Sequence, residues 1–114
     1  MWNIRQARSL IKRLQPDLMR AGWYCALAGG ILTKGKSDHD LDLVFVPMDT
    51  TKEDVFKLYH VLSYFGMQRI ISADLMQKAW RKKGSQDCKF VEWWETKDEK
   101  RIDVIIPTRS GKLA

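Results

Sequence analysis

The most constraining feature of this chain is an apolar run, residues 23–28, that leads into Gly29-Gly30. After nine intervening residues, a second run begins Asp40-Leu-Asp42. Nearly every position of the first run is apolar, which is typical of a strand covered on both faces. The two glycines predict the turn that ends it. Because side chains two residues apart on a strand share a face, Asp40 and Asp42 would point the same way from a second strand. The pattern therefore predicts a glycine turn followed closely by paired carboxylates.

Paired carboxylates on one strand face can bind divalent cations, and two cations about 3.5–4 Å apart are a common device in nucleotide chemistry. Glycine permits φ > 0 and close approach of a ligand phosphate, so Gly29-Gly30 before Asp40 and Asp42 favours a phosphate-and-metal site. A simpler alternative is that both aspartates are the polar start of a buried strand. A further alternative shifts the motif to Asp38-x-Asp40, but this would turn a histidine toward the core.

The glycine pair, the spacing and the Asp-apolar-Asp-apolar run resemble the signature of the DNA polymerase β-like nucleotidyltransferase superfamily. That superfamily includes tRNA CCA-adding enzymes, antibiotic adenylyltransferases and small antitoxin-type minimal nucleotidyltransferases. The resemblance covers residues 21–47, and a later aspartate strand extends it. Two departures stand out. Many members have Gly-Ser in place of Gly29-Gly30, and the basic residue common in the following loop has Lys34 and Lys36 as its counterparts here.

This resemblance implies an α/β (α+β) fold with a short mixed sheet and helices packed mainly on one side. It also implies a third carboxylate on a later strand, for which Asp103 is the first candidate and Glu92 the fallback. Mg²⁺ or Mn²⁺ and a nucleoside triphosphate are the implied ligands. Asp40, Asp42 and Asp103 would bind the metal and carry the catalysis, and the nucleotide would contact Gly29, Gly30, Lys34, Lys36 and Ser37.

The composition agrees with one folded, nucleotide-handling domain. With 114 residues, 45% of them hydrophobic, we expect a single domain spanning 1–114. No apolar run reaches membrane-span length and the first residues lack a signal-peptide core, so we expect a cytoplasmic protein without membrane contact. Cys25 and Cys88 make no disulfide framework. The net charge of +6 indicates a polyanionic partner and argues against an enzyme acting on cationic antibiotics.

The N-terminal segment, residues 3–14, has apolar residues at helical spacing, and Pro16 predicts a break or restart of the helix before Gly22 ends it. Its basic side chains fall largely outside the apolar stripe. A solvated face explains them most simply, and a nucleic-acid contact is the alternative. These basic residues are Arg5, Arg8, Lys12 and Arg13.

The second half predicts a helix capped by Thr51 and ended by Gly66, then a short strand, residues 67–71. His60, in that helix, is expected to be a packing or surface residue. A further helix, residues 73–83, carries a cluster that is either a nucleotide contact or a solvated helix end: Lys78, Trp80, Arg81, Lys82 and Lys83.

Residues 89–95 and 101–106 read as a β-hairpin. In the second strand, apolar residues alternate with Asp103, so Asp103 would point away from the apolar face of that strand. Symmetric closure of the turn would place Trp94 directly across from Asp103, on the same face.

We therefore expect a metal-dependent nucleotidyltransferase that transfers NMP, with AMP from ATP as the first candidate, to a hydroxyl of an RNA or protein acceptor. The chain holds little beyond the catalytic domain, so a partner subunit would supply the acceptor site. The alternative is a non-catalytic module on the same fold that binds a nucleotide, a nucleic acid or a protein partner, as an antitoxin does.

Overall fold

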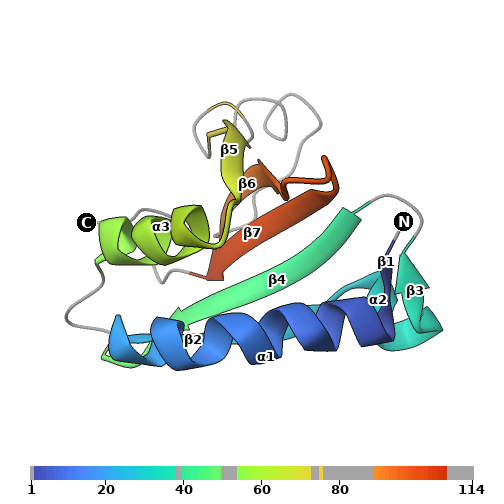
Figure 1. The fold of residues 1–114 in the computed structure, drawn as a ribbon, viewed down its shortest axis with the longest axis horizontal. Coiled ribbons are helices and arrows are strands. Elements are labelled where there is room, and N and C mark those ends of the chain that lie inside the picture. The colour runs from blue at the N-terminus through green and yellow to red at the C-terminus, as the bar shows by residue number, and fades with distance from the viewer. Residues whose placement is uncertain (1, 38–39, 50–53, 73–74, 76–88, 108–114) are drawn as a thin grey trace.

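A computed structural model of the chain shows a five-stranded mixed sheet with its two longer helices on one face (Figure 1). The structure describes residues 2–37, 40–49, 54–72, 75 and 89–107. This arrangement confirms the predicted α+β class. The elements in chain order are β1 (Trp2–Asn3), α1 (Ile4–Arg20), β2 (Trp23–Ala28), α2 (Gly30–Lys34), β3 (Lys36–Ser37), β4 (Asp40–Pro47), α3 (Val55–Tyr64), β5 (Gln68–Ile71), β6 (Lys89–Glu95) and β7 (Arg101–Pro107).

Helix α1 runs without a break through Pro16, so the predicted interruption is wrong. A proline inside a helix costs about 3 kcal/mol. Leu14 and Leu18, on either side of Pro16, are both fully buried, and burial of one leucine contributes about 1.5–3 kcal/mol. Their packing against the sheet therefore outweighs the proline. The helix begins with a capping box between Asn3 and Gln6.

Strand β2 is the end strand of the sheet order β2-β4-β7-β6-β5. Trp23 and Cys25 are buried, whereas Tyr24 between them is 44% exposed. The prediction that both faces of this strand are covered is therefore wrong. Its bounds agree with the sequence pattern, but α1 and α3 cover one face of the sheet only, so apolar residues on the other face stay accessible.

The core lies between that covered face and the two helices. Strands β4 and β7 are parallel neighbours at the centre of the sheet. Every second side chain of these strands is fully buried against α1 and α3. Because successive side chains of a strand point to opposite faces, the residues in between project from the other face of the sheet. The buried strand residues are Leu41, Leu43, Phe45, Ile102, Val104 and Ile106.

Helix α3 begins one turn later than predicted. Asp54 is its N-cap, and its carboxylate accepts hydrogen bonds from the backbone N–H groups of Phe56 at 3.1 Å and Lys57 at 3.3 Å. An aspartate cap satisfies N–H groups that the helix leaves unbonded, which explains this start. Thr51, the predicted cap, lies outside the described residues. His60 is exposed on α3.

Strands β6 and β7 form the predicted hairpin, but their register differs from the symmetric closure by one residue. Glu95 pairs with Arg101, so Trp93 and not Trp94 lies opposite Asp103. Trp94 is buried on the helix-covered face instead. The predicted helix over residues 73–83, with its basic cluster, lies outside the described residues except for residue 75.

Candidate functional site

The structure brings three predicted carboxylates together on the face of the sheet opposite α1 and α3. Asp40 and Asp42 lie on β4, and Asp103 lies on β7. One carboxylate oxygen from each lies within 4.8 Å of the other two. All three residues are half-buried. They form what we call the carboxylate cluster: Asp40, Asp42 and Asp103.

The parallel pairing of β4 and β7 produces this convergence. Asp42 is in register with Asp103, and Asp40 with Arg101. Registered residues on adjacent strands are neighbours on the same face. The cluster thus results from two alternating strands whose apolar residues are buried on one side, which leaves their aspartates on the other.

The electrostatics of Asp103 are strongly perturbed. Burial, and after it a hydrogen bond with the Asp40 carboxyl group, raise the pKa of Asp103 to about 7. Arg101 opposes both effects, because its Nε donates to Asp103 Oδ1 at 3.0 Å. Crowded carboxylates disfavour simultaneous ionisation, so the cluster favours a bound proton or a bound cation.

The glycine turn lies directly against this cluster. Gly29 has φ 68° and ψ −149°, a conformation that is close to glycine-only. A Cβ on Gly29 would lie 2.0 Å from Asp42 Oδ2. Gly30 begins α2 without a positive φ, and a Cβ there would meet only the Lys36 carbonyl oxygen at 3.9 Å. The conformational need for glycine therefore belongs to Gly29 and not to Gly30.

The remaining predicted nucleotide contacts lie just beyond the turn. Lys34 ends α2, and Lys36 and Ser37 form β3, which pairs with β1. Both lysines are exposed, and neither forms an ion pair in the part of the chain that the structure describes. Asp38, from the shifted motif, lies outside the described residues.

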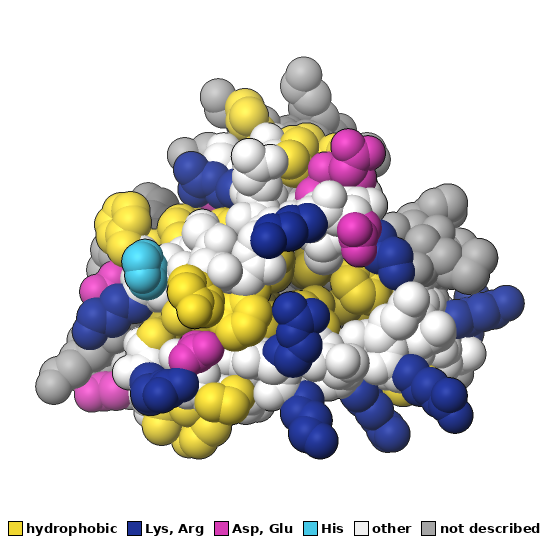
Figure 2. Space-filling model, in the orientation of Figure 1, with side chains coloured by type: hydrophobic (Ala, Val, Ile, Leu, Met, Phe, Trp, Pro, Cys, Tyr) yellow, Lys and Arg dark blue, Asp and Glu magenta, His cyan; other side chains and the backbone are white. Residues whose placement is uncertain are grey.

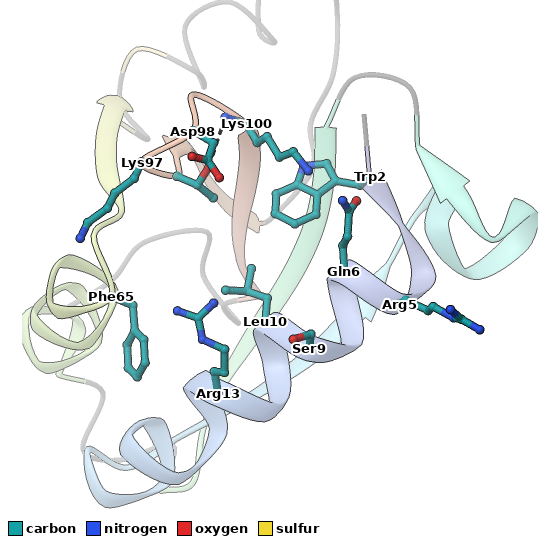
Figure 3. Close-up of a pocket in the computed structure, with 11 residues that line it drawn as sticks. Trp2, Arg5, Gln6, Ser9, Leu10, Arg13, Phe65, Lys97, Asp98 and Lys100 are labelled. Carbon is teal, nitrogen blue, oxygen red and sulfur yellow. Dashed lines mark hydrogen bonds between the residues drawn. The ribbon is translucent and has the colours of Figure 1, made fainter.

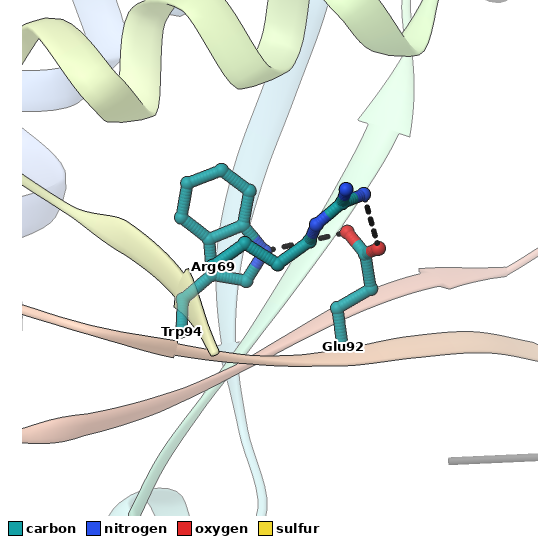
Figure 4. Close-up of polar contacts among 3 residues, drawn as sticks. All are labelled: Arg69, Glu92 and Trp94. Atoms are coloured by element: carbon teal, nitrogen blue, oxygen red, sulfur yellow. Dashed lines mark hydrogen bonds and ion pairs between the residues drawn. The ribbon is translucent and has the colours of Figure 1, made fainter. Parts of the chain in front are cut away.

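Glu92 is wrong as a fallback third ligand, because it points to the other face of the sheet. It is 1% exposed, and its Oε2 lies 3.1 Å from Arg69 Nη1 (Figure 4). Trp94 Nε1 donates to Glu92 Oε1 at 3.3 Å. Tyr59 also hydrogen-bonds Glu92 and Arg69, and burial raises the pKa of Tyr59 far above its ordinary value. Glu92 is thus the centre of a buried polar network beneath α3.

The sequence interpretation missed two residues beside the cluster. The Arg101 guanidinium lies 4.3 Å from the centre of the Trp93 ring while it holds Asp103. Trp93 Nε1 is buried and has no hydrogen-bond partner within the described residues. A signal for Arg101 was present, because it stands two positions before Asp103 and so shares its strand face.

The donor set fits a divalent cation of the Mg²⁺ or Mn²⁺ kind. Three carboxylate oxygens, with no histidine or cysteine among them, are the hard ligands that these ions prefer. Thiol chemistry has no support in the described residues, because Cys25 is buried and burial raises its pKa to about 12.

No model of a known protein family matches this chain, and no curated protein matches it. No helix in the described ranges is long and apolar enough to cross a membrane. The resemblance to nucleotidyltransferases therefore rests on the motif of residues 21–47 and stays a prediction.

Proposed function

We propose that this chain is a metal-dependent nucleotidyltransferase of the cytoplasm, which transfers NMP, with AMP from ATP as the first candidate, to a hydroxyl of an RNA or protein acceptor. The observation that carries the proposal is the convergence of Asp40, Asp42 and Asp103 directly against the backbone of Gly29. Two independent features of the sequence, the glycine pair and the aspartate pair, thus lie at one place in the fold.

In this proposal the carboxylate cluster holds divalent cations, which neutralise triphosphate charge and activate the acceptor hydroxyl when bound. Asp40 and Asp42 hold the cation on the nucleotide side. Asp103 serves the acceptor side, where its carboxylate can also accept the hydroxyl proton. Arg101 orients Asp103 through Oδ1, as residues behind a ligand commonly do.

The glycine turn is the proposed phosphate side of the site. Gly29 and Gly30 are exposed, and the absence of side chains lets phosphate oxygens approach the backbone. The exposed ammonium groups of Lys34 and Lys36 would offset phosphate charge from the adjacent α2 and β3, and Ser37 follows them.

Two measurements test the proposal. Calorimetry with Mg²⁺- or Mn²⁺-bound nucleoside triphosphates should show binding by the parent and none by Asp42→Asn. Pyrophosphate release should follow when RNA or a co-purifying protein is added as acceptor. Unchanged triphosphate affinity in folded Asp42→Asn would refute the metal assignment. Binding without turnover, over a broad set of acceptors, would favour the non-catalytic module.

A further inference from the structure

A groove lies on the helix-covered side of the molecule, between the first half of α1 and the turn that joins β6 to β7 (Figure 3). Its volume is about 560 Å³. Figure 2 shows this face of the molecule, with Lys and Arg side chains gathered around a hollow that has apolar side chains in its floor. We call it the α1–turn groove. The lining residues that carry its charge or contact its charged groups are Trp2, Arg13, Phe65, Lys97, Asp98 and Lys100.

The groove has an excess of positive charge. Arg13, Lys97 and Lys100 line it, and Asp98 is the one carboxylate among its lining residues. Arg5 also belongs to the lining but points away from the hollow in Figure 3. Within the described residues, none of these cations forms an ion pair. The excess charge is therefore left for a ligand or for solvent.

Contacts with apolar surface hold these cations in place without neutralising them. Lys100 Nζ lies 4.8 Å from the centre of the Trp2 ring, and the Arg13 guanidinium lies 5.9 Å from that of Phe65. Such cation–π contacts orient a charge but leave it available to an anion. The stem of Lys97 crosses Gly66, where a Cβ would lie 2.3 Å from Lys97 Cε.

The α1–turn groove and the carboxylate cluster adjoin the same end of β7. Trp2 Nε1, on the groove side, donates to the Arg101 carbonyl oxygen at 2.9 Å. Lys100 contacts the groove, whereas the next residue, Arg101, binds Asp103 on the other side of the sheet. The groove and the cluster therefore lie near the same end of β7, on opposite sides of the sheet.

We propose that the α1–turn groove binds the sugar–phosphate backbone of a single-stranded nucleic acid, with phosphates at Arg13, Lys97 and Lys100. A groove between one helix and one turn, with a volume in the range of small-ligand pockets, suits one strand better than a duplex. The net charge of +6 favours the approach of such a polymer. If the protein is a nucleotidyltransferase, the bound strand would be its acceptor, and this part of the inference rests on the proposed function. The binding of the strand does not rest on it.

The test measures binding by fluorescence anisotropy in EDTA, so that it is independent of metal and of turnover. The probe is a labelled single-stranded RNA of about 12 nucleotides, within the usual size of single-strand sites. An oligoglutamate peptide of equal length is the comparison ligand. The groove variant is Arg13→Gln with Lys100→Gln. Its matched control is Arg8→Gln with Lys12→Gln, which removes equal charge from exposed positions of α1 outside the groove.

The parent and the control should bind the RNA alike, and the groove variant should bind about tenfold more weakly. Loss of two phosphate contacts should also make the slope of log affinity against log salt less negative by about 1.4. Because Arg13 and Lys100 also pack on aromatic rings, the charge-preserving pair Arg13→Lys with Lys100→Arg should retain binding.

Three results would overturn the proposal: no RNA binding by the parent, equal loss in the groove variant and the control, or equal affinity for RNA and oligoglutamate. None of them bears on the carboxylate cluster, because Asp42→Asn should bind the RNA normally in this assay. Failure of the groove and failure of the nucleotidyltransferase proposal are therefore distinguishable.

Discussion

Replacement of Asp103 by asparagine should stabilise the metal-free protein above neutral pH. Burial and the neighbouring Asp40 raise the pKa of Asp103 from 3.8 to about 7. Each pKa unit corresponds to about 1.4 kcal/mol, so ionisation of Asp103 costs the folded state about 4 kcal/mol. Asparagine has nearly the same shape and cannot ionise, so the variant avoids this cost.

The effect has a definite sign and pH window. Between pH 4 and 7 the folded parent keeps the Asp103 proton that the unfolded chain has released, because the folded-state pKa is the higher one. The contribution of Asp103 to the free energy of unfolding of the parent therefore falls as pH rises through this window, and the loss of this contribution is complete above about pH 7. The difference between Asp103→Asn and the parent should grow from near zero at pH 4 to about 4 kcal/mol at pH 8.

Urea unfolding in EDTA, followed by tryptophan fluorescence across this pH range, measures the difference. Asp98→Asn, at an exposed turn position, is a suitable control, because surface substitutions usually change stability by less than about 0.5 kcal/mol. At pH 8, added Mg²⁺ should stabilise the parent more than Asp103→Asn, because ligands that bind the folded state raise its stability. A difference that stayed constant or shrank with rising pH would refute the crowded-carboxylate interpretation.

Three further predictions concern other parts of the fold. Gly29→Ala should lower the free energy of unfolding by about 2 kcal/mol or more, because Gly29 has a positive φ and lies against Asp42. Gly30→Ala should lower it by less than about 1 kcal/mol. Urea titrations of the two variants will show whether only the first position requires glycine. Arg69→Met should lower the free energy of unfolding by about 1–3 kcal/mol, because it removes the ion-pair partner of the buried Glu92 side chain. Adding Glu92→Met should recover much of that loss, and a double mutant no better than the single one would count against this role of the ion pair. Asp103→Ala should keep triphosphate affinity but lower turnover about 10²-fold, and undiminished pyrophosphate release would remove this residue from the proposed mechanism.

The local sequence pattern was enough to predict β2, the hairpin strands and the face shared by Asp40 and Asp42. Alternation in a strand depends on residues two positions apart, and a glycine turn depends on the backbone freedom of one or two residues. Such signals can be read without knowledge of the rest of the chain. They also predicted that Asp40 and Asp42, which lie beside Gly29 in the structure, belong to a functional site.

Tertiary structure alone decided which later carboxylate joins that pair. Asp103 and Glu92 both lie on strands of one hairpin, and the parallel register of β7 with β4 sets Asp103 beside Asp42 while Glu92 turns under α3. Helix α1 continues through Pro16 for the same kind of reason, because packing on the sheet outweighs a local preference. The pairing of strands, their order in the sheet and the packing of helices depend on contacts between segments far apart in the sequence. The local periodicity of one segment does not specify its partner or its register.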